Sequence, residues 1–514
     1  MSHEKKSLWY IPFVFTGTNT RFGNFIPAKS KNPSDRGGFG PKDETTGGTA
    51  LFDPFVLLAS FDAYAKMFNF VPKLGANMME YIKSFNYPYH LTNFGRPMWG
   101  GILSSVLKAE LGNEFIENSR NGPCIPRRGE GSFTGALDTI QALAIKKIFY
   151  GPKNTDVTDR VESAVAILHI ITGSGCIYGP VASSLVEKRM GCLLDYRYDT
   201  SQLRVIYPSE PALAVAALTQ FHNYPASIID DALLSYDCLT GSLGEIGEFG
   251  ARIIFLLALD SITLQRPFCT VNSFLRNLIG ESVDGLESLA INNPRLRSIL
   301  KGCVSFSHFT KALKLCDTPL ANLGLSVTLN AALSMPQNFQ GVDNVIPVVL
   351  ENGGLGSINV QVKSHARKMY PHEIGSIKTS IIGSGFCTSE YPSLNIIINV
   401  GPKHEYSCEL HKPTPKSHGA YSIVIHGIAG DFPLFKKFTD VQQKLEQLLG
   451  FGRFDVDLRK NKANLLSLSA DWPVCGSRTC GNWKDIVAVK ENKPKASTTR
   501  VSKPRTSKRR KSGR

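Results

Sequence analysis

Three patterns that identify common protein classes are missing from this sequence of 514 residues. No apolar run reaches the roughly 18 to 20 residues that a membrane-spanning helix needs, so we expect no membrane span. No segment matches Gly-x-x-x-x-Gly-Lys-Ser/Thr, the loop that cradles nucleotide phosphates, so we expect no ATPase activity. Eleven cysteines lack regular spacing, which indicates reduced thiols in a cytosolic or nuclear protein. Cys475 and Cys480 have no second ligand pair nearby, which argues against zinc.

Positive charge is abundant and unevenly placed. The formal net charge is +15, and residues 490–514, with eleven Lys/Arg and one Glu, contribute +10 of it. This segment ends in a basic run of four, Lys508, Arg509, Arg510 and Lys511. Such a run after Ser, Thr and Pro is typical of a disordered tail that directs a protein to the nucleus or binds nucleic acid. A solubilising tail without a partner is the alternative, because basic runs are unselective.

The most informative segment consists of two β-branched, apolar runs, residues 341–350 and 358–363. The connector 351–357 contains three glycines, which supply the positive φ that a chain reversal needs. The pattern predicts an antiparallel hairpin. If Leu350 faces Ile358 across the turn, the beginning of the first run lies beside the end of the second.

Polar residues then converge at this end of the hairpin. In the expected pairing, Asp343 lies near Lys363 and His365. Gln361 and Lys363 are two residues apart in a strand, so both point to one face. An acid at the start of one strand and Gln-x-Lys at the end of the next resembles the PD-(D/E)xK nuclease core, in the Gln-x-Lys form of Mrr-like restriction endonucleases.

The chemistry of phosphodiester hydrolysis accounts for these residue types. The negative charge of a phosphodiester repels nucleophiles, so a site needs a divalent cation on carboxylate and amide oxygens, and an ammonium group. The resemblance implies that Asp343 and Gln361 bind Mg²⁺ (or Mn²⁺) and that Lys363 positions water. Alternatively, Asp343 is an ordinary turn acid and Lys363 is a solvated lysine, since short motifs match by chance. Gln361 replaces the usual acid, so weaker cation binding is expected.

Further segments resemble a known group of proteins. Residues 94–99 read Phe-Gly-Arg-Pro-Met-Trp, residues 244–252 read Gly-Glu-Ile-Gly-Glu-Phe-Gly-Ala-Arg, and residues 306–311 read Phe-Ser-His-Phe-Thr-Lys. In this order they resemble the Crinkler and RHS-type effector family of fungi and oomycetes, which joins a P-loop NTPase region to a restriction-endonuclease-like domain. A simpler interpretation is that Arg96 and Trp99 cap and pack a helix.

The resemblance also implies a third metal ligand. In the nuclease core, a glutamate of the first helix commonly completes the metal site, and Glu248 is the candidate, with Glu245 in reserve. A glutamate near a helix start is otherwise a dipole partner or solvated. His308 either lies near the scissile phosphate or is a hydrogen-bonded structural histidine.

The expected fold class is α/β, with a helix-rich N-terminal region followed by a restriction-endonuclease-like mixed sheet flanked by helices. The apolar run 8–15 is expected to be a buried strand rather than a signal peptide. Residues 193–207 are expected to form a hairpin, and Ser209 to be the N-cap of a helix with Pro211 in its first turn. The expected domains are 1–50, a trailing piece of a P-loop NTPase-like domain; 51–225, a helical linker or winged-helix-like region; 226–450, the nuclease-like domain; 451–489, an extension; and 490–514, the basic tail.

These expectations lead to two functions, with a truncated transposon or effector relic without present function as a weaker third possibility. The first is a metal-dependent DNA endonuclease-like effector directed to the nucleus. The second is a catalytically inactive nuclease-fold protein that binds DNA, host nuclear proteins or a nuclear import receptor. The two differ in whether the chain cleaves DNA in the presence of Mg²⁺ or Mn²⁺.

Overall fold

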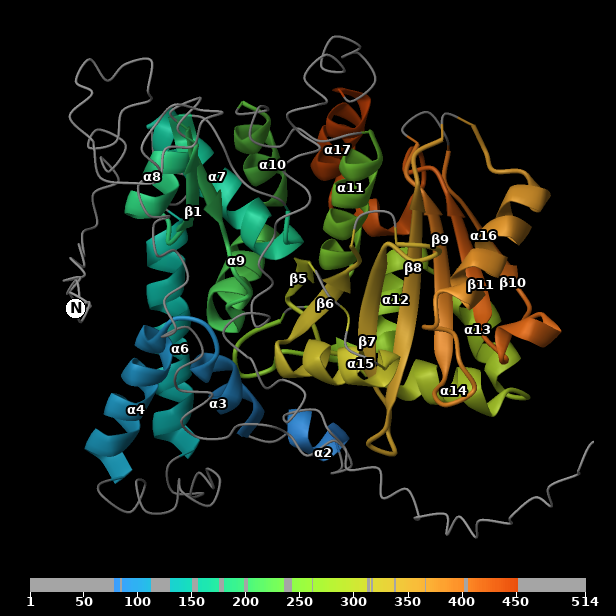
Figure 1. The fold of residues 1–514 in the computed structure, drawn as a ribbon, viewed down its shortest axis with the longest axis horizontal. Coiled ribbons are helices and arrows are strands. Elements are labelled where there is room, and N and C mark those ends of the chain that lie inside the picture. Colours follow the sequence, from blue (N-terminus) through green and yellow to red (C-terminus); the bar gives the residue numbers. More distant parts are fainter. Residues whose placement is uncertain are drawn as a thin grey trace, which may run out of the picture.

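The computed structural model describes residues 78–83, 86–111, 130–149, 156–174, 180–197, 202–234, 243–260, 262–311, 315, 318–336, 339–365, 367–401 and 405–451. Within these ranges the fold is mixed α/β, as predicted: a helix-rich part precedes a mixed sheet flanked by helices (Figure 1). Every helix in the described ranges is too short or too polar to cross a bilayer. The predicted strand 8–15, the segment 1–50, the extension beyond residue 451 and the basic tail lie outside the described residues.

The helix-rich part contains one small hairpin among its helices. Its elements are α2 (Met78–Lys83), α3 (Asn86–Asn93), α4 (Pro97–Leu111), α6 (Glu130–Ile148), α7 (Val157–Thr172), α8 (Pro180–Lys188), β1 (Cys192–Arg197), β2 (Gln202–Ile206), α9 (Pro211–Asn223) and α10 (Pro225–Leu233). Strands β1 and β2 pair antiparallel, which confirms the hairpin predicted at 193–207.

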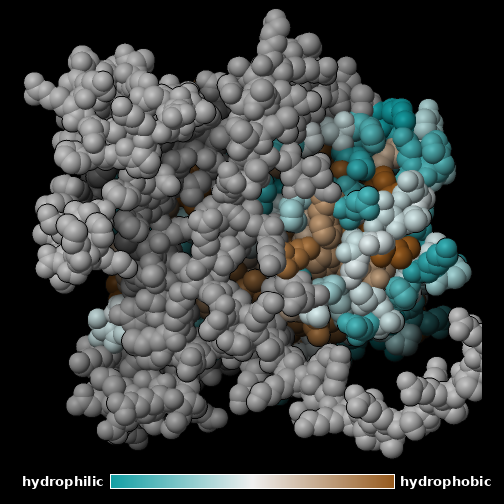
Figure 2. Space-filling view, in the orientation of Figure 1, coloured by the Kyte–Doolittle hydropathy of each residue, from teal (hydrophilic) through white to brown (hydrophobic). Residues whose placement is uncertain are grey.

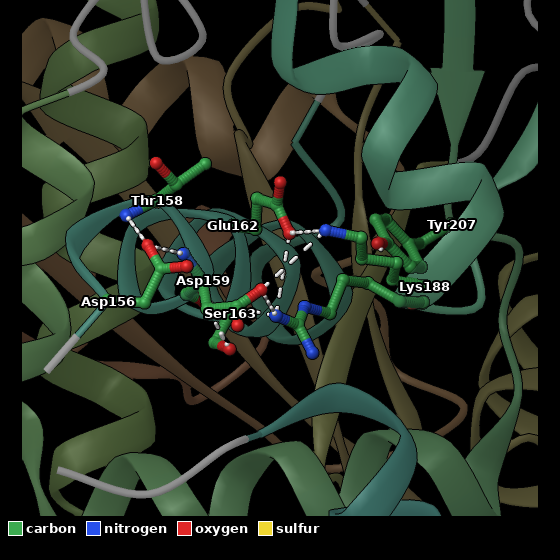
Figure 3. A network of polar contacts seen from close by, with 8 residues as sticks. Asp156, Thr158, Asp159, Glu162, Ser163, Lys188 and Tyr207 are labelled. Atoms are coloured by element: carbon green, nitrogen blue, oxygen red, sulfur yellow. Dashed lines mark hydrogen bonds and ion pairs between the residues drawn. The ribbon is translucent and has the colours of Figure 1, made fainter. Parts of the chain in front are cut away.

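A buried ion network joins α7 to the end of α8 (Figure 3). The side chain of Arg189 is fully buried, and its Nη2 lies 3.0 Å from Asp159 Oδ1 and 3.4 Å from Glu162 Oε2. Lys188 Nζ lies within 4 Å of the same two carboxylates. The hydroxyl of Tyr207 donates to the Arg189 carbonyl over 3.0 Å. Two carboxylates therefore offset the charge that the fold buries at Arg189.

The start of α9 differs from the prediction. Glu210, not Ser209, is the N-cap residue, although Pro211 does occupy the first turn. Ser209 Oγ instead hydrogen-bonds His308 Nε2 over 2.8 Å. The Glu210 carboxylate lies 3.0 Å from Arg96 Nη1 and accepts from Trp99 Nε1 over 3.1 Å. Arg96 and Trp99 thus anchor α4 to α9, in line with the simpler interpretation of that segment.

The sheet and its helices follow. Their bounds are α11 (Leu243–Leu257), β3 (Cys269–Thr270), α12 (Val271–Ile279), α13 (Ser282–Ala290), α14 (Pro294–Lys301), β4 (Cys303–Val304), β5 (His308–Lys311), α15 (Pro319–Thr328), β6 (Ala331–Ser334), β7 (Asn344–Val349), β8 (Leu355–Lys363), α16 (Pro371–Gly383), β9 (Ser393–Asn399), β10 (Ser407–His411), β11 (Tyr421–His426) and α17 (Thr439–Phe451), with 3₁₀ turns at Pro415–Ser417 and Pro433–Lys436. The strand order is β10-β11-β9-β8-β7-β4-β3, and β6 joins β5 to β7. Strands β8, β9 and β11 run parallel, whereas β7 and β10 are antiparallel to their neighbours.

Alternation along β7 and β8 builds two apolar layers on the faces of the sheet. Ile346, Val360 and Val362 belong to the larger hydrophobic cluster, which includes α11, α12 and α14. Residues of the opposite parity, such as Val345 and Val349, belong to the cluster with α15 and α16. The larger cluster also includes residues of α4, α6 and α9, so the helix-rich part and the sheet share one core. The domain division at 225 stays a prediction.

The central hairpin forms as predicted, but in a different register. Strand β8 begins at Leu355, and Asn344 pairs with Val360. The expected pairing would have placed Asn344 opposite Ser364, so that expectation was wrong by four residues. The connector is shorter than expected because Gly356 is a strand residue: a Cβ there would come 2.8 Å from the Pro392 carbonyl oxygen. Gly356 therefore permits a close strand approach rather than a turn.

Candidate functional site

Helix α11 carries two charged residues one turn apart, Glu248 and Arg252. The helix buries Ile246, Phe249 and Ile253 against the larger cluster. Arg252 Nη2 lies 2.9 Å from Glu248 Oε2, so the two side chains form an i,i+4 ion pair. The second half of the helix is buried all round, as its apolar run predicted.

Arg252 is the most extensively bound side chain of this region. Its residue is 7% exposed. The Nε donates to Asn344 Oδ1 over 3.0 Å, and Nη1 donates to the Thr172 carbonyl over 3.3 Å. The Nη2 also donates to Ser334 Oγ over 2.7 Å. One guanidinium group therefore ties α7, α11, β6 and β7 together, since each nitrogen has a partner on a different element.

The start of β7 and the end of β8 bring Asp343 and Gln361 into contact. Gln361 Nε2 donates to Asp343 Oδ2 over 2.6 Å, and the Val362 backbone N–H donates to the same oxygen over 2.6 Å. Gly341, with φ of 87°, precedes Asp343; a Cβ at this glycine would collide with the backbone of Ser380. The tight passage at Gly341 is what allows the chain to enter β7 with Asp343 facing β8.

Lys363 follows Gln361 on the same side of β8. It is partly buried, and its charge helps to lower the pKa of Asp343. Burial is the larger effect on Asp343 and raises its pKa above the usual value, while the Val362 N–H and the charges of Lys363 and Arg252 lower it. Asp343 and Gln361 are therefore in contact at this end of the central hairpin, and Lys363 is within electrostatic reach of Asp343.

Glu248 lies on α11, near the same end of the hairpin as Asp343. Burial raises the pKa of Glu248 to about 7, although the Arg252 charge lowers it. The charge on Asp343 raises the Glu248 pKa further, so these two carboxylates are within electrostatic reach of each other. The carboxylate of Glu248 is bound to Arg252, however, and not to Asp343 or Gln361. Glu245, in the first turn of α11, is exposed and adds a smaller repulsion.

Asp343 and Gln361 are the oxygen-bearing side chains available to a divalent cation at this end of the hairpin. Gln361 presents its amide nitrogen to Asp343, and the carboxylate of Asp343 and the amide oxygen of Gln361 are donors of the kind that Mg²⁺ prefers. Burial is the main cause that raises the pKa of both Asp343 and Glu248. No cluster of three His, Cys, Asp or Glu suited to a metal occurs among the described residues. With only one carboxylate and one amide available here, a cation held by Asp343 and Gln361 would keep most of its waters, as Mg²⁺ often does.

Arg252, Asn344, Ser334 and Thr172 are the members of this region that sequence reasoning missed. The Glu-x-x-x-Arg spacing of 248 and 252 was a signal for the ion pair. Nothing in the sequence pointed to Thr172 or Ser334, because they reach Arg252 through tertiary packing alone.

His308 lies in a separate, buried position. It is 2% exposed and hydrogen-bonds Ser209 Oγ and Ser307 Oγ. Burial lowers the pKa of His308 to about 3, so the imidazole is neutral at physiological pH. Its contacts match the structural alternative. The basic run 508–511 lies outside the described residues.

Comparison with known proteins adds a family match without an activity. Residues 155–378 match the family model of a domain of unknown function, DUF8736. The match extends from the start of α7 into α16 and includes Glu248, Arg252, Asp343, Gln361 and Lys363. No curated protein and no solved structure matches the chain.

Proposed function

We propose that this chain is a metal-dependent DNA endonuclease of the PD-(D/E)xK type, in its Gln-x-Lys form, that acts in the nucleus. Membership of the Crinkler and RHS-type effector group is part of the proposal. The observation that carries it is the 2.6 Å contact between Asp343 and Gln361, with Lys363 two residues further along the strand. The raised pKa of the nearby Glu248 supports it, because perturbed carboxyl groups cluster at functional sites.

Each side chain has a distinct task in this proposal. Asp343 and Gln361 supply the oxygens that hold a Mg²⁺ or Mn²⁺ ion, which when bound lowers the pKa of water and offsets phosphate charge. The Lys363 ammonium group orients the attacking water and stabilises the charge that develops on the phosphate oxygens. Glu248 adds negative charge beside the cation, and Arg252 holds the Glu248 side chain on α11. Lys508, Arg509, Arg510 and Lys511 direct the chain to the nucleus through an import receptor or bind DNA.

Nicking of supercoiled plasmid by the purified full-length protein tests the proposal. Cleavage is expected with Mg²⁺ or Mn²⁺ and is expected to disappear in Asp343→Ala and Lys363→Ala. The surface variants Asp284→Ala and Lys301→Ala are matched controls, because these side chains are 60% and 57% exposed and form surface ion pairs. Undiminished cutting by Asp343→Ala and Lys363→Ala would remove both residues from the mechanism.

A second function is favoured by one specific contact. Glu248 is bound by Arg252, and Gln361 stands where the usual acid would be, so the site has less negative charge for a cation. These features suit a nuclease-fold protein without activity that binds DNA or host nuclear proteins. This second function predicts no cleavage with either metal. It also predicts salt-sensitive DNA binding that depends mainly on residues 490–514. Unchanged DNA binding after deletion of this tail would contradict it.

A further inference from the structure

The segment that follows Lys363 exposes an unusual set of side chains. The described residues 364–365 and 367–373, here called the β8–α16 segment, lie between the end of β8 and the first turn of α16. Arg367, Lys368, Tyr370 and His372 are all exposed. Tyr370, at 53%, is the most exposed aromatic side chain among the described residues. Figure 2 shows a largely hydrophilic surface on the side of the molecule where α16 lies.

A buried asparagine holds this segment against the sheet. Asn399 is fully buried at the end of β9, where it pairs with Lys363. Its Oδ1 accepts from the His365 backbone N–H over 2.8 Å, and its Nδ2 donates to the Arg367 carbonyl over 2.9 Å. The segment is therefore positioned relative to Lys363 by a buried side chain, rather than left to solvent.

Arg367, Tyr370 and His372 form a stack of flat side chains. The Arg367 guanidinium lies 4.2 Å from the centre of the Tyr370 ring. The His372 ring is stacked on Tyr370, with ring centres 5.7 Å apart and planes 15° apart. Both terminal nitrogens of Arg367 donate to Glu373 over 2.7 Å, which sets the plane of the guanidinium. The Tyr370 N–H is also bound by Glu373, so one carboxylate orders the whole stack.

Basic residues lie along the chain around this stack, and two of them, Arg367 and Lys368, are each paired with a glutamate. Lys363 and Lys368 flank Arg367 along the chain, and His365 lies close enough to lower the pKa of Glu373. Lys368 is paired with Glu409 on β10, but its side chain is 56% exposed. Flat π surfaces beside cations are the features that proteins use to bind single-stranded nucleic acid: bases stack on the rings and phosphates meet the cations.

We propose that the β8–α16 segment binds a single-stranded stretch of nucleic acid next to Lys363. An unpaired base extends the stack formed by Tyr370, His372 and Arg367, and the neighbouring phosphates contact Arg367 and Lys368. A single strand is specified because bases inside a duplex do not offer their faces to side chains. The choice of nucleic acid as the ligand rests on the proposed nuclease function.

The test is a binding measurement that does not depend on cleavage. Fluorescence anisotropy of a labelled single-stranded oligonucleotide is measured with the full-length protein in chelator, and a duplex of the same sequence is measured in parallel. Tyr370→Ala is expected to weaken single-strand binding by about 5- to 150-fold, the usual loss for one stacked base. Tyr370→Phe, which keeps the ring, is expected to stay within about 2-fold of the wild type. Tyr224→Ala removes another partly exposed tyrosine, 36% exposed at the N-cap of α10, and is expected to bind as the wild type.

Each outcome bears on the inference. The basic tail is present in every variant, so its contribution to the binding affinity cancels when the variants are compared. Equal binding by Tyr370→Ala and the wild type, or equal losses in Tyr370→Ala and Tyr224→Ala, overturns the inference even if plasmid is nicked. A selective loss in Tyr370→Ala without any nicking supports the inference and counts against the nuclease. Unchanged melting temperature is expected for Tyr370→Ala, since the side chain is largely in solvent.

Discussion

Arg252 Nη2 lies 2.9 Å from Glu248 Oε2, and the guanidinium of Arg252 is buried while the carboxylate is 32% exposed. Arg252 is always charged, so a permanent positive charge lies beside Glu248. Glu248 is the carboxylate that the resemblance to nucleases assigns to the metal. Arg252 offsets the negative charge of Glu248 through this ion pair. A divalent ion at Asp343 and Gln361 would therefore share the negative charge of Glu248 with Arg252.

Replacement of Arg252 is predicted to destabilise the protein. Arg252→Met leaves Glu248, Asn344 Oδ1 and Ser334 without their donor, and we expect a loss of about 3 kcal/mol in the free energy of unfolding. Urea unfolding measures it. Arg276→Met is the matched control, because Arg276 is 48% exposed and its surface ion pairs are expected to contribute less than about 1 kcal/mol. Equal losses in the two variants would contradict a structural role for the Arg252 contacts.

The raised pKa of Glu248 predicts a pH dependence of stability. A native pKa of about 7 against an ordinary 4.5 means that the folded protein binds more protons than the unfolded chain between these values. Stability from this group is complete below pH 4.5 and is lost as pH rises to 7. We expect a decrease of about 1 to 2 kcal/mol, allowing for solvent screening, that Glu248→Gln abolishes. Urea unfolding across this range in chelator measures it; the same decrease in Glu248→Gln would place its origin elsewhere.

Cation binding at Asp343 and Gln361 predicts a metal-dependent increase in melting temperature. A ligand that binds only the folded state stabilises it by about 2.7 kcal/mol at 100 times its Kd. Thermal unfolding with increasing Mg²⁺ or Mn²⁺ should therefore show a rise in the wild type and in Asp284→Ala. The rise is expected to vanish in Asp343→Ala. An identical rise in that variant would show that the metal binds at another position.

The core of the hairpin predicts a large cost of truncation. Ile358 is fully buried and pairs with Ile346 in the centre of the sheet. Ile358→Ala is expected to reduce the free energy of unfolding by about 2 to 5 kcal/mol. Val157→Ala, at a side chain that is 50% exposed, is expected to stay within about 0.5 kcal/mol of the wild type. A small effect at Ile358 would be inconsistent with its place in the core.

Local sequence patterns were sufficient to predict the hairpin but not its register. The β-branched runs at 341–350 and 358–363 are strands because their side chains fill both apolar layers of the sheet. The turn could not be placed, since glycine permits both a reversal and a close approach of backbone. Gly356 belongs to the second kind, and its neighbour, the Pro392 carbonyl, is distant in sequence.

Sequence patterns also predicted only part of the candidate site. Asp343, Gln361 and Lys363 followed from strand periodicity and an antiparallel pairing, and the contact between the first two survives the shift in register. The partner of Glu248 required the structure. Helical spacing made Arg252 an available neighbour, but its other contacts come from β6, β7 and α7.

The sequence by itself determined the periodic elements, the two-residue spacing of Gln361 and Lys363, and the apolar half of α11, because each follows from local geometry and side-chain type. Tertiary structure alone decided which oxygen Gln361 meets, that Arg252 holds Glu248, and that Asn399 fastens the segment after Lys363 to the sheet. Those contacts join residues between 4 and 34 positions apart, and most depend on how separate strands and helices pack around the shared core.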